Sequence, residues 1–252
     1  LGYLERGNVL IGTKPNGAAF AIVGADSVAL SRASIEVGFE AIGVAASAVT
    51  DEMVTAAIAK DIGVEPRDVV VVEQPGTFHL DMAMTTWTRG CVLLNDIEAV
   101  QRLMQARHGA SFRVPQLQRI ANMERMVAQA LRQAGLRVVR TPGRFPPSTR
   151  GAEDACHFFN GAGGIGAGAS AHWITQHGPP EYVQGFAQAL ERGGATVPRI
   201  HMISPEASRL SLAIAGGVNC RIVPLVAPAR VAPPRRRSHG PRHTRAVVRA
   251  RR

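Results

Sequence analysis

The sequence predicts a mixed α/β fold in which a β-β-α-β unit is repeated along the chain. Its 252 residues are 46% hydrophobic, enough for the core of one ordinary or large domain. The chain contains 26 glycines and 16 prolines, so turns are frequent and a helical bundle is disfavoured. Strand-like and helix-like segments follow one another in this order roughly every fifty to seventy residues. We therefore expect one architecture that recurs.

The first unit is expected to begin with a hairpin. Segments 8–12 and 18–24 are strand-like and flank residues 14–17, Lys-Pro-Asn-Gly, whose Asn-Gly pair is typical of a tight turn. The rest of the unit is expected as a helix, a strand, a second helix capped by Asp51 and ended by Gly63, and a strand, at residues 25–38, 41–46, 51–60 and 68–72.

Two later segments have clear periodicity. Alternation over residues 78–84 predicts a strand that places His79 and Asp81 on one face. Apolar residues at helical spacing predict an amphipathic helix over residues 115–134. The other expected elements are a glycine-rich segment at 160–170, strands at 91–94, 136–139, 157–159, 171–175 and 199–203, and helices at 180–192 and from Ser204 to Gly217.

The net charge of +10 is concentrated in the last part of the chain. Residues 228–252 contain nine arginines and no acidic residue, so the rest of the chain is close to neutral. We expect a folded domain at 1–227 and a disordered Arg/Pro-rich tail at 228–252. The tail is either a basic arm for nucleic acid or acidic lipid, or the product of a shifted reading frame, which its composition favours. Nucleic acid as a partner is supported by the tail alone.

Three cysteines, Cys91, Cys156 and Cys220, form an odd set without the spacing of a disulfide scaffold. This indicates free thiols in a reducing compartment, and hence a cytoplasmic protein. We expect no bound metal, because cysteines and histidines are not clustered. No apolar run is long enough to span a membrane, and no signal peptide is seen.

A formal GxGxxG sequence at residues 161–166 does not predict a nucleotide site. The segment that follows it, Ala171 to Ile174, is strand-like, whereas a dinucleotide loop opens into a helix and needs an acidic residue about twenty positions on. We therefore expect no cofactor. The apolar surroundings of Cys91 and Cys156 favour structural roles for both.

Four motifs point to a chemistry. They are Glu5-Arg6-Gly7-Asn8, His79-Leu80-Asp81, Phe158-Phe159-Asn160-Gly161 and Gly216-Gly217-Val218-Asn219-Cys220. A thiol, an imidazole and two carboxylates can open a guanidinium group through a covalent intermediate. In this order and spacing the motifs resemble those of the guanidino-group-modifying superfamily, the penteins. This superfamily includes arginine and agmatine deiminases, dimethylarginine hydrolases and amidinotransferases.

The resemblance implies a five-bladed α/β propeller of ββαβ units, here lacking part of its first unit. It implies that residues 1–227 form the catalytic domain, with the active site on the propeller axis. Cys220 would be the nucleophile and His79 the general acid and base, while Glu5 and Asp81 would hold the guanidinium. Asn8 and Asn160 would be further substrate contacts.

The reaction implied is hydrolysis of a C–N bond in a small guanidino compound, arginine or a derivative of it. Two alternatives stay open. One is transfer of the amidino group to an amine acceptor. The other is a non-catalytic binding protein of the same fold, which the replacement of a usual glycine by Arg6 brings into consideration.

Overall fold

The computed structural model describes residues 7–74, 79–143, 158–159, 161–165 and 170–213. The chain divides into a unit Leu1–Ile222 and a short unit Val223–Arg252, and all described residues belong to the first. The predicted boundary between residues 227 and 228, and the whole tail, lie outside the described residues.

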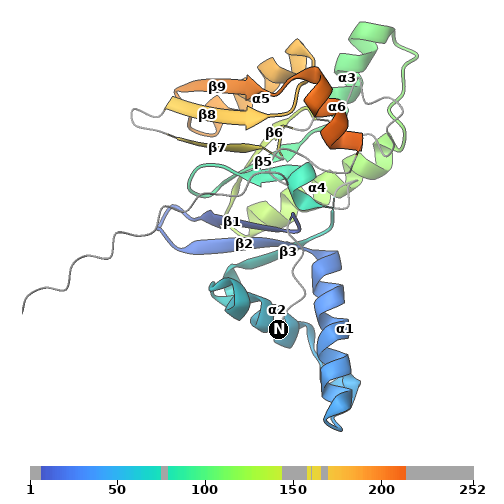
Figure 1. The fold of residues 1–252 in the computed structure, drawn as a ribbon, viewed down its shortest axis with the longest axis vertical. Coiled ribbons are helices and arrows are strands. Elements are labelled where there is room, and N and C mark those ends of the chain that lie inside the picture. The colour runs from blue at the N-terminus through green and yellow to red at the C-terminus, as the bar shows by residue number, and fades with distance from the viewer. Residues whose placement is uncertain (1–6, 75–78, 144–157, 160, 166–169, 214–252) are drawn as a thin grey trace, which may run out of the picture. The chain divides into compact units, whose positions relative to one another are not determined.

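The described chain is a mixed α/β structure with three small sheets (Figure 1). In each sheet two strands form an antiparallel hairpin, and a third strand pairs in parallel with the second. A helical segment connects the second and third strands each time. The repeated β-β-α-β order is therefore confirmed, with units that begin at Val9, Met84 and Ala162, a slightly longer period than expected. Closure into a five-bladed propeller stays a prediction.

The first unit contains β1 (Val9–Thr13), β2 (Ala19–Gly24), α1 (Ala25–Ala41), α2 (Asp51–Ile62) and β3 (Val69–Val72). The predicted hairpin is confirmed, with Gly17 at a φ of 88° in its turn. Thr50 rather than Asp51 caps α2, because its Oγ1 accepts a hydrogen bond from the Met53 N–H, and Gly63 ends the helix in the left-handed conformation. The strand expected at 41–46 is wrong: α1 continues to Ala41, and the residues that follow, including Ile42 and Val44, are exposed and have little burial to favour a strand.

The second unit contains β4 (Met84–Thr86), β5 (Cys91–Asn95), α3 (Ile97–His108), α4 (Leu117–Gln133) and β6 (Arg137–Thr141). Helix α4 confirms the predicted amphipathic helix. The strand expected at 78–84 is wrong, because Leu80–Met82 is a 3-10 turn and β4 begins only at Met84. The backbone N–H groups of Leu80 and Asp81 bond to Asn8 and Gly7 instead of to a neighbouring strand.

The third unit contains β7 (Ala162–Ile165), β8 (Ser170–Thr175), α5 (Pro180–Arg192) and β9 (Val197–Met202), and α6 (Pro205–Ala213) follows. Helix α5 has its predicted bounds. Phe158 and Phe159 are buried but form no strand, which corrects that prediction, and His157 lies outside the described residues.

Strand β7 is made of residues that the GxGxxG sequence contains. It pairs antiparallel with β8, and a Cβ added to Gly163 would lie 2.5 Å from the Trp173 ring. Glycine is needed here because the two strands and the indole approach closely. The described part of the glycine-rich segment is thus one arm of a β-hairpin, and not a loop opening into a helix.

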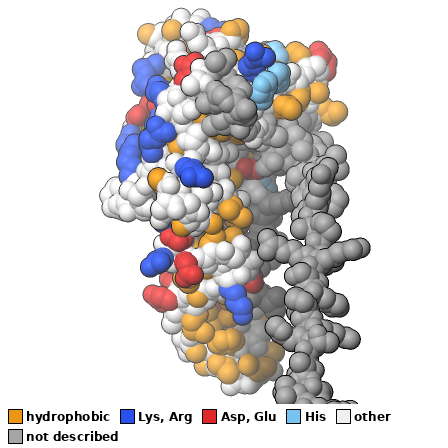
Figure 2. All heavy atoms as spheres, turned by 90° about the vertical axis from the view of Figure 1, so that its left-hand side faces the viewer, with side chains coloured by type: hydrophobic (Ala, Val, Ile, Leu, Met, Phe, Trp, Pro, Cys, Tyr) orange, Lys and Arg blue, Asp and Glu red, His pale blue; other side chains and the backbone are white. Residues whose placement is uncertain are grey.

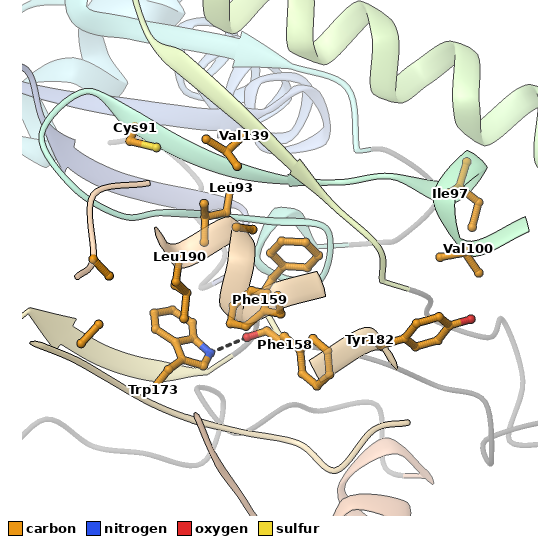
Figure 3. Packing of buried hydrophobic residues seen from close by; sticks show 14 of the residues in the cluster. Cys91, Leu93, Ile97, Val100, Val139, Phe158, Phe159, Trp173, Tyr182 and Leu190 are labelled. Atoms are coloured by element: carbon orange, nitrogen blue, oxygen red, sulfur yellow. Dashed lines mark hydrogen bonds between the residues drawn. The ribbon is translucent and has the colours of Figure 1, made fainter. Parts of the chain in front are cut away.

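Helices separate the successive sheets. Residues of α1 and α2 pack on one face of the first sheet. Val127, Ala128 and Leu131 of α4 pack in one cluster with the other face of that sheet and with the second sheet. Helix α5 packs in a third cluster between the second and third sheets, where Trp173 Nε1 donates a 2.7 Å hydrogen bond to the Phe158 carbonyl (Figure 3). None of the described helices has the length and apolarity needed to cross a membrane.

Candidate functional site

Two of the sequence motifs meet where the chain enters β1. The Asp81 N–H donates a 3.0 Å hydrogen bond to the Gly7 carbonyl, and the Leu80 N–H donates a 3.1 Å hydrogen bond to Asn8 Oδ1. The turn that carries His79 and Asp81 is therefore held against the Gly7–Asn8 segment, which lies 72 positions away in the sequence from Leu80.

Gly7 allows the imidazole and the carboxylate to lie together. Its φ of 90° is in the left-handed region, which glycine adopts without strain. A Cβ at this position would lie 2.7 Å from His79 Nδ1 and 3.0 Å from Asp81 Oδ1. The side chains of His79 and Asp81 therefore both lie close to the Cα of Gly7. The prediction that His79 and Asp81 are presented together is correct, although a turn and not a strand presents them.

His79 and Asp81 differ in exposure. Asp81 is buried, with 3% of its surface exposed, whereas His79 is half-buried. A carboxylate at this depth interacts strongly with charged and hydrogen-bonding neighbours, because water screens it little. An imidazole that is partly open to solvent can exchange protons with a ligand or with water.

Asn8 connects the start of β1 both to β2 and to the turn that precedes β4. It is 1% exposed, its carbonyl accepts a 2.9 Å hydrogen bond from the Gly24 N–H, and its side-chain oxygen accepts from Leu80. Asn8 thus fixes the end of β2 and the turn of His79 relative to β1. Its predicted contact with substrate stays a prediction.

Gln74 is a buried polar residue next to Asn8 that sequence reasoning missed. It follows the end of β3 by two residues and is 6% exposed. A Cβ on Gly24 would lie 2.8 Å from Gln74 Nε2 and 3.2 Å from Asn8 Oδ1, so the amide packs beside Asn8. The only sequence signal was its place just after the apolar strand Val69–Val72, since functional groups often gather at the carboxyl ends of parallel strands.

Three predicted site residues, Glu5, Asn160 and Cys220, lie outside the described residues, as does Cys156. Their roles stay predictions. Cys91 is fully buried in β5, and burial raises the pKa of its thiol. Because the thiolate is the reactive form, this supports the structural role predicted for Cys91.

The described surface carries charges of both signs. Figure 2 shows Lys and Arg side chains interspersed with Asp and Glu on one face of the molecule. This mixture does not produce a field of one sign over that face. Among the described residues no three or more His, Cys, Asp or Glu side chains are grouped so that they could hold a metal ion.

No family model and no curated protein sequence matches the chain. Solved structures to which this chain is similar include an agmatine deiminase from C. jejuni, with 12% sequence identity and a TM-score of 0.49 over 86% of this chain and 54% of that one. A cysteine-to-serine variant of the C. jejuni enzyme with substrate bound has 11% identity and a TM-score of 0.45 over 85% and 54% of the two chains. These neighbours are members of the pentein superfamily, and this chain spans about half of their length.

Proposed function

We propose that this chain is a cysteine-dependent hydrolase that acts on the C–N bond of a guanidino compound, arginine or a derivative of it. The observation that carries the proposal is the meeting of His79 and Asp81 over Gly7, in which two separate motifs of the sequence form one local structure. The Gly-Gly-x-x-Cys motif that ends at Cys220 supplies the nucleophile of the proposal.

Asp81 and Glu5 are the proposed ligands of the guanidinium. This cation is planar and carries only N–H donors, which match the paired oxygens of a carboxylate. The burial of Asp81 supports this role, because the attraction between a carboxylate and a cation is stronger where water is excluded. In the proposal Asn160 and Asn8 contribute to the shape of the same pocket.

The proposed reaction has two steps. The Cys220 thiolate adds to the guanidinium carbon, and the C–N bond breaks as His79 protonates the leaving amine, which leaves an amidino group on the sulfur. His79 then takes a proton from water, whose oxygen adds to the same carbon, and the C–S bond breaks to return the thiolate. One water is consumed, the proton that remains on its oxygen is released to solvent and taken up by the amine, and a neutral urea group and an ammonium ion are formed. A cation beside the thiol favours the thiolate by lowering its pKa.

The proposal is tested by labelling with 2-chloroacetamidine, a guanidinium mimic that alkylates thiols, followed by mass spectrometry of the cysteine peptides. We expect rapid modification of Cys220 alone, protection by arginine, and a large loss of rate in His79→Ala. His172→Ala is the matched control, because His172 is exposed on β8 of the third sheet and its Nδ1 lies 3.1 Å from His201 Nε2.

Iodoacetamide, which has no amidinium group, should show no such selectivity for Cys220. Equal and slow labelling of Cys91, Cys156 and Cys220 by 2-chloroacetamidine would contradict the proposal and favour a non-catalytic protein of the same fold.

A further inference from the structure

A groove between α3 and α5 contains none of the motifs of the proposed mechanism. Its volume is about 630 Å³, within the range of sites that bind small molecules. The side chains that line it come from the two helices, from the residue that caps α3 and from the end of β6. The groove therefore belongs to the junction of the second and third units, whereas Gly7 and Asp81 meet between the first and second units.

The walls of the groove are fixed by packing beneath it. Helices α3 and α5 share one hydrophobic cluster, and Figure 3 shows Val100 of α3 and Tyr182 of α5 among its side chains. Gly185 of α5 lies against Pro142, because a Cβ on Gly185 would be 2.9 Å from Pro142 Cγ. A ligand would thus enter a groove that is already formed and would not have to order its walls.

The charges of the groove do not cancel. Three arginines and two acidic residues line it, which gives a formal net charge of +1: Arg102, Arg140, Arg192, Asp96 and Glu181. Arg140 is an ion-pair partner of the buried Glu124, and it also lies 3.7 Å from Asp96. Glu181 lies 3.7 Å from Arg107. Counting these outer partners, Glu124 and Arg107, leaves the net charge at +1.

The excess positive charge lies on opposite walls. Arg102 of α3 and Arg192 of α5 are exposed, and neither has an acidic partner among the described residues. Arg192 donates one hydrogen bond of 2.9 Å to the Arg140 carbonyl, so most of the donors of its guanidinium stay available. Gln184 and Gln188 precede Arg192 at intervals of four residues, which places three groups of donors along one face of α5.

We propose that this groove binds a small organic carboxylate, to whose oxygens Arg102 and Arg192 donate from the two walls. Guanidinium groups match carboxylates because their paired N–H donors meet paired oxygens. One carboxylate neutralises the net charge of the lining, whereas a doubly charged phosphate ester would leave excess negative charge beside Asp96 and Glu181. Leu103 provides apolar surface for the rest of the ligand.

The test is a titration of the full chain with benzoate, followed by 1H–15N NMR, which reports both affinity and position. Benzoate has one carboxylate on an apolar ring, benzamide has the same shape without the charge, and phenyl phosphate has nearly two charges. We expect benzoate to cause saturable shifts in α3, α5 and the end of β6. Benzamide should bind at least tenfold more weakly, because it lacks charge-assisted hydrogen bonds, and phenyl phosphate should bind no more tightly than benzoate.

Two variants assign the binding to the two walls. Arg102→Gln and Arg192→Gln should each weaken benzoate binding by about tenfold, the effect of losing a hydrogen bond to a charged group. Arg119→Gln is the matched control, because Arg119 is exposed on α4 and does not line the groove, so that the same charge is removed elsewhere. If Arg192→Gln does not fold, Arg102→Gln decides the question, since Arg102 makes no hydrogen bond or ion pair to other described residues.

Three results would overturn the proposal. They are equal benzoate affinity in wild type and Arg102→Gln, an equal loss of affinity in Arg119→Gln, which would indicate only general attraction to a basic chain, and tighter binding of phenyl phosphate than of benzoate at the same residues. Because the experiment measures binding alone, its result does not depend on the proposed hydrolase activity.

Discussion

At Gly7 the absence of a Cβ atom leaves the space into which the side chains of His79 and Asp81 pack. The imidazole of His79 and the carboxylate of Asp81 both occupy space that a Cβ would need, and the backbone at Gly7 has a φ of 90°. The sequence motif around Gly7 is thus explained by local sterics: it leaves room for the groups that the proposed chemistry uses. A residue with a side chain here would meet a steric and a conformational penalty together.

The two penalties can be separated with a pair of alanine variants. Gly17 has a φ of 88°, like Gly7, but a Cβ there would contact nothing within 4 Å. We expect both Gly7→Ala and Gly17→Ala to lower the free energy of unfolding by about 1–2 kcal/mol through backbone strain. Only Gly7→Ala should also displace His79 or Asp81 and slow the labelling of Cys220 by 2-chloroacetamidine.

Urea unfolding and labelling rates measure the two effects. If Gly7→Ala and Gly17→Ala labelled Cys220 at the same rate, the contact of Gly7 with His79 and Asp81 would have no part in the site.

At the scale of elements, Glu124 of α4 connects four segments of the second unit. Its carboxylate accepts hydrogen bonds from Asn95 at the end of β5, from the Ile97 N–H at the start of α3, and from Arg140 of β6. Glu124 is fully buried, and burial raises the pKa of its carboxyl group to about 7 against the opposing effects of these donors. The second unit therefore contains an internal titrating group.

The raised pKa of Glu124 predicts the direction in which the free energy of unfolding changes with pH. Below the unfolded value of 4.5 both states are protonated, and between 4.5 and about 7 the folded state binds a proton that the unfolded state has lost. The contribution of protonation to stability is thus complete at low pH and is lost as the pH rises through about 7. Relative to Glu124→Gln, which does not titrate, wild type should lose up to about 3 kcal/mol of unfolding free energy between pH 4.5 and 7.5.

Urea unfolding of both proteins across this range gives the difference, in which the other titrating groups cancel. Glu98→Gln serves as the control, because Glu98 is an exposed partner of Arg125 and its loss should change stability little at any pH. A difference between wild type and Glu124→Gln that stays constant or grows with pH would contradict the assignment.

Short sequence patterns predicted those elements whose structure is determined by residues close to one another in the sequence. The Asn-Gly turn, the apolar spacing of α4 and the proline start of α5 are of this kind. Helix α3 was missed although Asp96 caps it and Ile97, Val100 and Met104 recur at helical spacing. The segment at 78–84 alternates like a strand, but its backbone hydrogen bonds go to residues far away in the sequence, which alternation does not reveal.

The same distinction applies to the site. His79 and Asp81 were found because they belong to one short motif, and they lie together as predicted. Gln74 was not found, because a single glutamine has no spacing pattern and its place beside Asn8 depends on the packing of β2 against β3. Strand β7 was taken as part of a glycine-rich segment, because glycines carry no side-chain alternation by which a strand can be recognised.

At the scale of the molecule, the described part of the chain contains three successive ββαβ units with helices between their sheets. The described part of the site belongs to the junction of the first two units, where Gly7 and Asn8 before β1 meet the turn before β4. The central claim is that Cys220, distant in the sequence, acts at this junction on a guanidinium group.

Turnover of arginine in water enriched in 18O tests that claim most directly. The proposed steps predict a ureido product that carries one 18O atom, release of one ammonia for each product, and loss of both in Cys220→Ser and in His79→Ala. Absence of a ureido product from folded wild-type protein, with arginine and other guanidino compounds returned unchanged, would contradict the account.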